Sequence, residues 1–447
     1  MSPLPFQGFG ASGESLTRIM IPKILSFVRW LWRSLIPATL RHFFHVGVKR
    51  GQAYLLNAGQ DLKDKLHCLQ KNIDPWLSRL PGHSELRVVG LFSASHGISR
   101  GASLTCRALD QLGLPYVRVD ASSLVHSPKD AHLLEAHALG WIIQMNPPEL
   151  NDIVRNGGPE AMKGPRYGYW AYELPTAPAE WRVSEAYVEE IWAVSKYTAK
   201  AFGSFSKSVR TMPHPIILAD YAQVVAAQKR AEFSAIAFFD FNSSVARKNP
   251  GGAISAFKAA FGDDPSTCLT IKTQNGHLFP EILDQLKRSA TSNITIIDEV
   301  WDHGRVLSEI KSADVLLSLH RAEGFGLVMA EAMALGTPVI ATGWSGNMDF
   351  TDATCALLTP YALIPVRDEQ GIYQGQHWAD PDLAFASDSL RRLRAEPNLG
   401  PRLSKAAREA IKSKLSPEAW YSHFPLGLRW RIFRSAQGRR SAPAPNQ

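Results

Sequence analysis

The sequence predicts an α/β protein with two mostly parallel sheets, each covered by helices, and three observations carry this prediction. Short apolar runs of strand length alternate with helical stretches, which is the pattern of βαβ units. The alternation occurs in two separate series along the chain. A chain of 447 residues is also long enough for two domains. We therefore expect one sheet domain over residues 84–218 and a second over residues 232–400.

Residues 1–60 form a basic segment with a helical apolar stripe. Residues 1–51 hold seven lysines and arginines against Glu14 alone, which places +6 of the total formal charge of +8 there. The stripe consists of Ile24, Leu25, Val28, Leu31, Trp32 and Leu35. Prolines and internal arginines interrupt the run, which is too broken for a transmembrane span. We interpret it as an amphipathic helix on an anionic membrane surface. A helix packed on the protein and a targeting peptide are the alternatives.

The remaining composition limits the possible partners. Outside the N-terminal segment the chain is nearly neutral, which argues against a nucleic-acid partner. The four cysteines are scattered and lack the spacing of a zinc site or a disulfide framework. A reducing cytoplasm, with peripheral attachment to the inner face of the membrane, is the expected location.

The first series begins with "LRVVGLFSASHGISRGASLTCRALDQLGLPYVRVD", which predicts a strand over Val88–Phe92, a loop of small residues, a helix over Ala102–Leu112 and a second strand. Asn146 follows the apolar run "WIIQM", and Glu173 lies in "GYWAYELP". Both are expected at strand ends, where open α/β sheets bind their ligands. Either residue could contact a ligand, and a capping or turn role is the alternative.

The second series contains "AIAFFDF", "LTIKT", "NITIID", "DVLLSL" and "TPVIAT" as strands. The join between Pro215 and Glu232 is rich in Ala and Gln, which predicts a helical hinge. Residues 401–435 are expected to be helical, and the biased composition of residues 436–447 predicts a disordered tail.

The stretch "EGFGLVMAEAMALGTPVIAT" places two carboxylates around a glycine-flanked turn. It predicts a helix over about Leu327–Leu335, with Gly324 and Gly326 allowing close approach of a phosphate to the helix start. Like charges repel, so Glu323 and Glu331 would accept hydrogen bonds from hydroxyl groups on either side of the phosphate. A nucleotide sugar supplies such hydroxyls. The alternative is that both are ordinary helix residues in contact with solvent.

This stretch resembles the E-x7-E signature of the retaining nucleotide-sugar glycosyltransferases of the GT-B fold, family 4. The segments "DFNSSVARKNPGGAISAFKAAF" and "YGYWAYELPTAPAEWRVSEAYVEEIWAVSKYTAKAF" are similar to those of bacterial members. The resemblance extends from about Leu86 to Leu415. It implies two Rossmann-like domains facing each other across a cleft, with the last helices crossing back to the N-terminal domain. It also implies retaining transfer of a hexose from a UDP- or GDP-sugar, without metal or other cofactor.

The resemblance also implies roles for individual residues. Glu323 would contact the transferred sugar, and Lys248 the diphosphate, with Glu323 and Lys248 as the catalytic pair. The donor-binding residues would be Glu331, which would contact the ribose, together with Gly324, Phe325, Gly326, Leu327, Arg247 and Lys272. Ser243 departs from the family, where an arginine is common, and Lys272 is a candidate replacement or a solvated lysine. In the N-terminal domain Gly97, Asn146 and Glu173 would line the acceptor side, while the neighbouring His96 and Arg100 have structural alternatives.

Other function classes lack their motifs. The best Asp-x-Asp, Asp380–Asp382, reads as a helix N-cap and not as a metal site. No dinucleotide fingerprint and no phosphate-binding P-loop occurs. The expected acceptor is a saccharide or a lipid-linked saccharide, in polysaccharide or glycoconjugate synthesis. Two alternatives stay open: a non-catalytic glycosyltransferase-like partner in a membrane-attached assembly, and another sugar-nucleotide or phosphorylase activity on the same fold.

Overall fold

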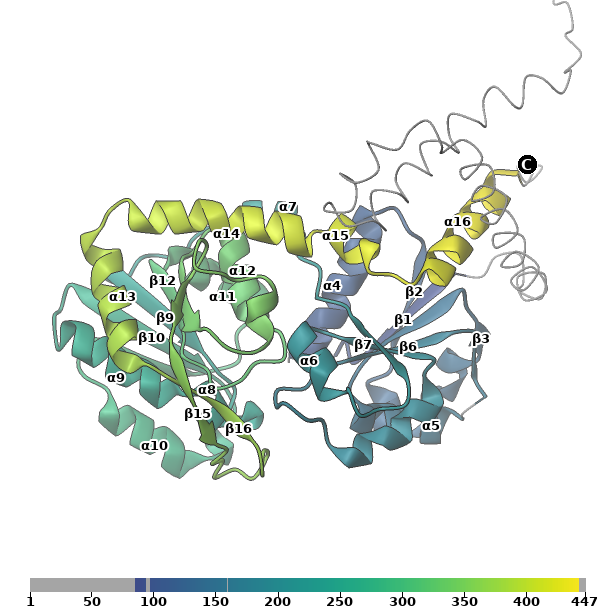
Figure 1. Ribbon diagram of the computed structural model, residues 1–447, viewed down its shortest axis with the longest axis horizontal. Helices are drawn as coiled ribbons and strands as arrows, with labels where there is room; N and C mark the ends of the chain where they lie inside the picture. The colour runs from purple at the N-terminus through teal and green to yellow at the C-terminus, as the bar shows by residue number, and fades with distance from the viewer. Residues whose placement is uncertain (1–84, 94–96, 159, 442–447) are drawn as a thin grey trace, which may run out of the picture. The chain divides into compact units, whose positions relative to one another are not determined.

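The computed structural model describes residues 85–93, 97–158 and 160–441, and it contains two six-stranded parallel sheets (Figure 1). This confirms the predicted α/β class. The amphipathic segment of residues 1–60, His96 and the tail residues 442–447 lie outside the described residues.

The first sheet has the strand order β2-β1-β4-β6-β7-β8, with every pair parallel. Its strands are β1 (Leu86–Gly90), β2 (Tyr116–Asp120), β4 (Gly140–Gln144), β6 (Arg166–Trp170), β7 (Glu190–Ala193) and β8 (Ser208–Thr211). Its helices are α4 (Gly97–Gln111), α5 (Pro147–Gly157) and α6 (Lys196–Ala201). Strand β4, "GWIIQ", is buried at every position. Such unbroken apolar runs form central strands because both faces of a parallel sheet are covered.

The second sheet has the order β11-β10-β9-β12-β13-β14. Its strands are β9 (Phe233–Phe238), β10 (Thr267–Thr273), β11 (Ile294–Asp298), β12 (Val315–Ser318), β13 (Val339–Thr342) and β14 (Leu357–Thr359). Its helices are α8 (Val245–Lys248), α9 (Pro250–Phe261), α10 (Pro280–Ser289), α11 (His303–Ser312), α12 (Leu327–Leu335) and α13 (Leu383–Ala395). A hairpin of β15 (Tyr361–Pro365) and β16 (His377–Pro381), which was not predicted, precedes α13.

Both sheets reverse their winding direction beside the first strand. After β9 the chain adds β10 and β11 on one side and then returns to place β12 on the other. The loops that follow β9 and β12 therefore leave adjacent strands in opposite directions. Ligands of open α/β sheets bind at such a switch point, outside the carboxyl ends of the strands. Both loops carry predicted site residues.

The connection between the two sheets differs from the sequence prediction. Only α7 (Leu218–Ala222) is helical in the join, and residues 223–230 form no helix. The prediction of a helical hinge over the whole stretch was therefore wrong. Alanine and glutamine are good helix formers, but intrinsic propensity is a weak preference that tertiary packing overrides, and most helical stability comes from burial of an amphipathic face.

The chain ends in three helices, drawn in yellow in Figure 1: α14 (Leu399–Leu415), α15 (Pro417–Ser422) and α16 (Leu426–Ser441). Trp420, Phe424 and Leu428 join the same core as Tyr167 and Trp192 of the first sheet. Helix α16 reaches Ser441 and so continues six residues into the stretch that was expected to be disordered. Among the described residues, no helix has the length and hydropathy needed to cross a membrane.

Candidate active site

The turn before α12 is shaped by close backbone packing. Gly326 has a φ of +95°, which an L side chain rarely adopts, and no side chain caps the N-terminus of α12. A Cβ on Gly346 would lie 2.0 Å from the carbonyl oxygen of Gly324, so the two loops pack backbone against backbone. The N–H of Gly346 donates to the carbonyl of Glu323 at 2.9 Å, and the N–H of Glu323 donates to Ser345 Oγ at 2.8 Å. The first N–H groups of α12 are thus available for an anion.

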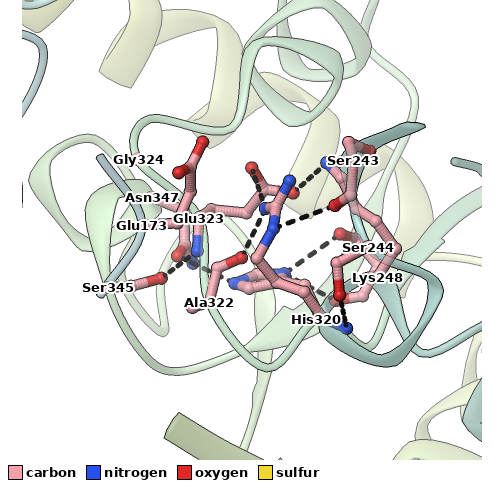
Figure 2. A network of polar contacts seen from close by, with 12 residues as sticks. Glu173, Ser243, Ser244, Lys248, His320, Ala322, Glu323, Gly324, Ser345 and Asn347 are labelled. Atoms are coloured by element: carbon pink, nitrogen blue, oxygen red, sulfur yellow. Dashed lines mark hydrogen bonds and ion pairs between the residues drawn. The ribbon is translucent and has the colours of Figure 1, made fainter. Parts of the chain in front are cut away.

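Glu323 is ion-paired with the loop that follows β9 (Figure 2). Lys248 Nζ donates to Glu323 Oε1, and Arg247 Nη1 lies 3.5 Å from Glu323 Oε2. Burial opposes ionisation of Glu323, which is 9% exposed, but the charges of Lys248 and Arg247 outweigh it and lower its pKa to about 2. The structure therefore joins the two residues that were predicted as the catalytic pair.

Helix α8 presents Lys248 from a constrained position. Ser244 and Asn249, at its two ends, have φ values of +65° and +54°. Such backbone is costly for residues with a side chain and persists only where contacts hold it. Ser244 Oγ accepts from the N–H of Arg247 at 3.1 Å, and Asn249 Nδ2 donates to the carbonyl of Leu319 at 2.9 Å. The first bond caps α8 itself, and the second ties α8 to the loop after β12.

Arg247 is directed at the protein backbone. Its guanidinium donates to the carbonyls of Ala322 at 2.8 Å and Ser243 at 3.2 Å, and the residue is 3% exposed. It was predicted as a donor-binding residue. In this geometry Arg247 holds the loop that carries Glu323. Lys248, by contrast, has 22% of its side chain exposed.

Glu173 reaches the same network from the first sheet's half of the chain (Figure 2). Tyr373 Oη donates to Glu173 Oε2 at 2.8 Å, and the Tyr373 ring lies 5.7 Å from the guanidinium carbon of Arg247. Nearby, Thr198 Oγ1 donates to the carbonyl of Gly324 at 3.2 Å. A carboxylate from the N-terminal half thus lies beside the glycine turn of the C-terminal half.

The carboxylate of Glu331 accepts hydrogen bonds from side chains of three other helices. Its Oε1 lies 3.0 Å from Arg100 Nε, 3.2 Å from Tyr221 Oη and 2.8 Å from His303 Nε2. Burial opposes its ionisation, but His303 and Arg100 outweigh burial and lower its pKa. Glu331 was predicted at the ribose, and in this structure its carboxylate binds side chains of the protein itself.

Sequence reasoning missed this role of Arg100. Arg100 lies in the first turn of α4, directly after the loop that follows β1. A cation in the first turn after that loop lies at the carboxyl end of the sheet, where ligands bind, and that position was the available signal. Tyr221 and His303 carried no comparable signal, because each stands alone in an otherwise unremarked helix. Tyr373 and Gln376 lie in the segment between β15 and β16, which the sequence did not reveal as a hairpin.

Three predicted residues are not brought to Glu323. Lys272 is buried, donates to Gln274 Oε1 at 3.2 Å and lies 5.9 Å over the Trp301 ring, and burial lowers its pKa. Asn146 Oδ1 accepts from the N–H of Ala171 at 2.9 Å, which ties β4 to β6. Gly97 begins α4, and a Cβ there would meet nothing within 4 Å. No packing requirement explains glycine at that position.

Two further side chains have structural roles. Trp344 packs against Tyr197 and Tyr361 with ring centroids 5.6 and 5.0 Å away. Asp382 caps α13, as predicted, by accepting from the N–H groups of Ala384 and Phe385. Within the described residues, no three His, Cys, Asp or Glu side chains are grouped as a metal site would require.

Comparisons with known proteins bear on the family and the fold. Residues 240–354 match the family model described as "Glycosyl transferases group 1". No curated protein matches the chain in sequence. Sucrose-phosphate synthase from Thermosynechococcus elongatus is similar in structure, with a TM-score of 0.57 at 15% identity, over 79% of this chain and 100% of that one. Anabaena HepE, in complex with UDP and glucose, has a TM-score of 0.53 at 11% identity, over 80% and 100%.

A third structure, Staphylococcus aureus TarM with UDP, has a TM-score of 0.47 at 13% identity and covers 66% of this chain. The chain spans only 55% of the length of TarM. Identities this low establish the fold alone, and that fold is GT-B, as the resemblance implied. The GT-B fold and the match over residues 240–354 together support a group 1 glycosyltransferase.

Proposed function

We propose that the protein is a retaining, metal-independent glycosyltransferase that moves a hexose from a UDP- or GDP-sugar to a saccharide or lipid-linked saccharide. One observation carries the proposal. An ionised Glu323, paired with Lys248, stands beside the uncapped N-terminus of α12 at the switch point of the second sheet. This arrangement brings together a cation, a helix N-terminus without a side-chain cap and a hydrogen-bond acceptor.

Each part of a nucleotide sugar has a partner in this arrangement. The diphosphate would bind Lys248 and the N–H groups of the Gly324–Leu327 turn, since both favour negative charge. Arrival of the diphosphate would draw Lys248 from Glu323 and free that carboxylate to accept from sugar hydroxyls. Glu331 would accept from the ribose through Oε2, since its three protein donors all contact Oε1. UDP and glucose bound to Anabaena HepE, which shares this fold, are consistent with such a donor.

The reaction itself needs stabilisation of the leaving group. A bond forms between the acceptor oxygen and C1 of the donor sugar, the bond from C1 to the phosphate oxygen breaks, and the acceptor proton passes to the departing diphosphate. Retention requires that the acceptor approaches from the face that the diphosphate leaves. Lys248 and the α12 N–H groups would stabilise the charge that develops on the diphosphate, the role of preorganised donors in group transfer.

Glu173, on the N-terminal side, is proposed to contact the acceptor. Its carboxylate already accepts from Tyr373 beside the glycine turn, so an acceptor hydroxyl there would compete with one phenol only. A lipid-linked acceptor would suit a protein attached peripherally to the inner face of the cytoplasmic membrane, in polysaccharide or glycoconjugate synthesis.

Thermal stabilisation by nucleotides tests the donor proposal. The protein would be melted with UDP, GDP, ADP and their common sugar conjugates, as wild type, Lys248→Ala and Lys258→Ala. Ligand at a hundredfold excess over its dissociation constant should add about 2.7 kcal/mol to the free energy of unfolding. One nucleotide family should stabilise wild type and Lys258→Ala, whose exposed lysine lies on the neighbouring α9. Lys248→Ala should lose most of this gain.

Two results would contradict the proposal. If no nucleotide stabilises the wild type, the protein is better explained as a non-catalytic glycosyltransferase-like partner in an assembly. If a nucleotide stabilises Lys248→Ala as well as wild type, the diphosphate binds elsewhere. Retention is checked separately by NMR, from the anomer first released when water replaces the acceptor.

A further inference from the structure

Helix α16 carries apolar side chains on two opposite faces. Leu428 and Ile432 point into the core and are 1% and 6% exposed. Leu426, Trp430 and Phe433 are 70%, 38% and 51% exposed. Their spacing of four and three residues places these three on one stripe, and a turn of about 100° per residue sets that stripe opposite the buried pair. We call Leu426, Trp430 and Phe433 the outer stripe.

The outer stripe is not explained by the packing of the protein. One apolar face is enough to hold a surface helix on its domain, and the opposite face is normally polar. Isolated apolar side chains on a surface need no explanation, but three large ones in line on one helix indicate a contact. Leu426 and Phe433 are among the more exposed large apolar residues of the described chain.

The charge of α16 indicates what that contact is. Its sixteen residues contain five arginines and no acidic residue. Arg429 and Arg434 flank the outer stripe on its two sides, and the guanidinium of Arg434 lies 5.8 Å over the Trp430 ring. An apolar stripe containing tryptophan, bordered by arginines, is the arrangement of helices that lie in the interface of an anionic bilayer. The tryptophan occupies the headgroup level and the arginines bind lipid phosphates.

Charge also argues against two other partners for the outer stripe, a second copy of α16 and the N-terminal segment of the chain. A second copy of α16 would bring its own Arg429 and Arg434 against the same arginines of the first copy, and residues 1–51 of the chain itself carry a net +6. Both would repel α16. We propose that the outer stripe and its arginines are a docking surface for an anionic lipid bilayer. The proposed lipid-linked acceptor gives this surface its purpose, and in that respect the inference rests on the proposed function.

Vesicle flotation of the full-length protein tests the proposal. Wild type should float with phosphatidylglycerol–phosphatidylcholine vesicles and not with phosphatidylcholine alone. In the variant Leu426→Ser/Trp430→Ser/Phe433→Ser, the fraction of protein that floats with the vesicles should fall at least about fivefold. The matched control Val183→Ser/Val225→Ser/Leu278→Ser also removes three exposed apolar side chains, from other elements, and should bind as wild type. Arg429→Gln/Arg434→Gln should weaken binding most at low salt, where electrostatic attraction is strongest.

Three results would overturn the docking surface. These are equal flotation of the outer-stripe variant and wild type, failure of wild type to bind anionic vesicles, and a change of oligomeric state in the outer-stripe variant without a change in flotation. If that variant melts well below wild type, the two-arginine variant decides the matter, because it leaves the apolar side chains in place. Nucleotide stabilisation, measured on the same samples, reports separately on the proposed function.

Discussion

Glu323 is ionised in a place where burial alone would favour the neutral acid. The nearby Lys248 and Arg247 reverse that preference, so two cations stabilise the Glu323 carboxylate in the loop between β12 and α12. Arg247 is committed to backbone carbonyls, so Lys248 is the partner that a substrate can exchange. Of the two cations that contact Glu323, Arg247 is thus fixed and Lys248 is exchangeable.

The lowered pKa of Glu323 makes its contribution to stability dependent on pH. Its folded pKa of about 2 lies below the ordinary value of 4.5, so the stabilisation is present above about pH 4.5 and is lost as the pH falls towards 2. Glu323→Gln should cost about 3 kcal/mol at pH 7, with the gap to wild type narrowing below pH 4.5. Urea unfolding across this pH range measures the difference in free energy. Glu281→Gln, which replaces an exposed acid on α10, is the control. A gap that is the same at every pH would contradict the assignment.

Arg100 and Arg107 offer a matched comparison on α4. The pair of Arg100 with Glu331 has side-chain exposures of 27% and 4%, whereas Arg107 and Asp220 have 51% and 35%. Arg100→Ala should lower the free energy of unfolding by about 2 kcal/mol, because it leaves a buried carboxylate with fewer donors. Arg107→Ala should cost less than about 1 kcal/mol. Chemical denaturation of both variants measures these two losses of unfolding free energy. Equal losses would mean that the contacts of Glu331 stabilise the protein no more than a surface ion pair does.

At the scale of elements, the turn into α12 depends on backbone that approaches too closely for any side chain. Gly346→Ala would drive a methyl group into the carbonyl of Gly324, so the turn must shift. We expect a loss of at least about 2 kcal/mol and a loss of nucleotide stabilisation. Gly251→Ala, in the first turn of α9 with open space around it, should be neutral or slightly stabilising. Unchanged nucleotide binding in Gly346→Ala would show that the turn does not form the donor site.

Sequence could predict those elements whose pattern is local. The bounds of α12 matched at both ends because Gly326 and Gly336, each with positive φ, mark them. Strand β1 was placed two residues too far along, since its apolar run continues past the paired residues into Leu91 and Phe92. Strand β15 is mostly exposed and β16 is mostly buried, and neither alternates clearly, so the hairpin carried no signal. The partners of Glu331 come from three distant helices, and their meeting depends on how those helices pack.

At the scale of the whole described molecule, the two halves are joined by a paired amide contact. Gln376 Nε2 donates to the carbonyl of Thr176 at 2.9 Å, and the N–H of Thr176 donates to Gln376 Oε1 at 2.8 Å. Lys196 N–H also donates to Asp349 Oδ2 at 2.7 Å. Such contacts favour the state in which the halves lie together, and substrates of enzymes with two lobes exchange mainly when the lobes separate.

Gln376→Ala should therefore speed release of whichever nucleotide stabilises the protein. Two hydrogen bonds of ordinary strength would shift the balance towards separation by about tenfold. Stopped-flow displacement of the nucleotide measures the release rate. Gln285→Ala, an exposed glutamine on α10, should leave that rate unchanged. A release rate in Gln376→Ala equal to that of wild type would show that the paired contact does not limit exchange.

The last helices also determine when the protein can finish folding during its synthesis. Phe424 packs against Trp192 with ring centroids 5.1 Å apart, and Leu428 fills the space beside Gly140 in the middle of the first sheet. The core of the sheet formed by residues 86–211 is thus incomplete until side chains more than two hundred residues later have been synthesised. Part of the sheet's apolar face stays uncovered while the second half is translated, which is the interval when nascent chains aggregate or engage chaperones. The half that is made first is therefore completed last.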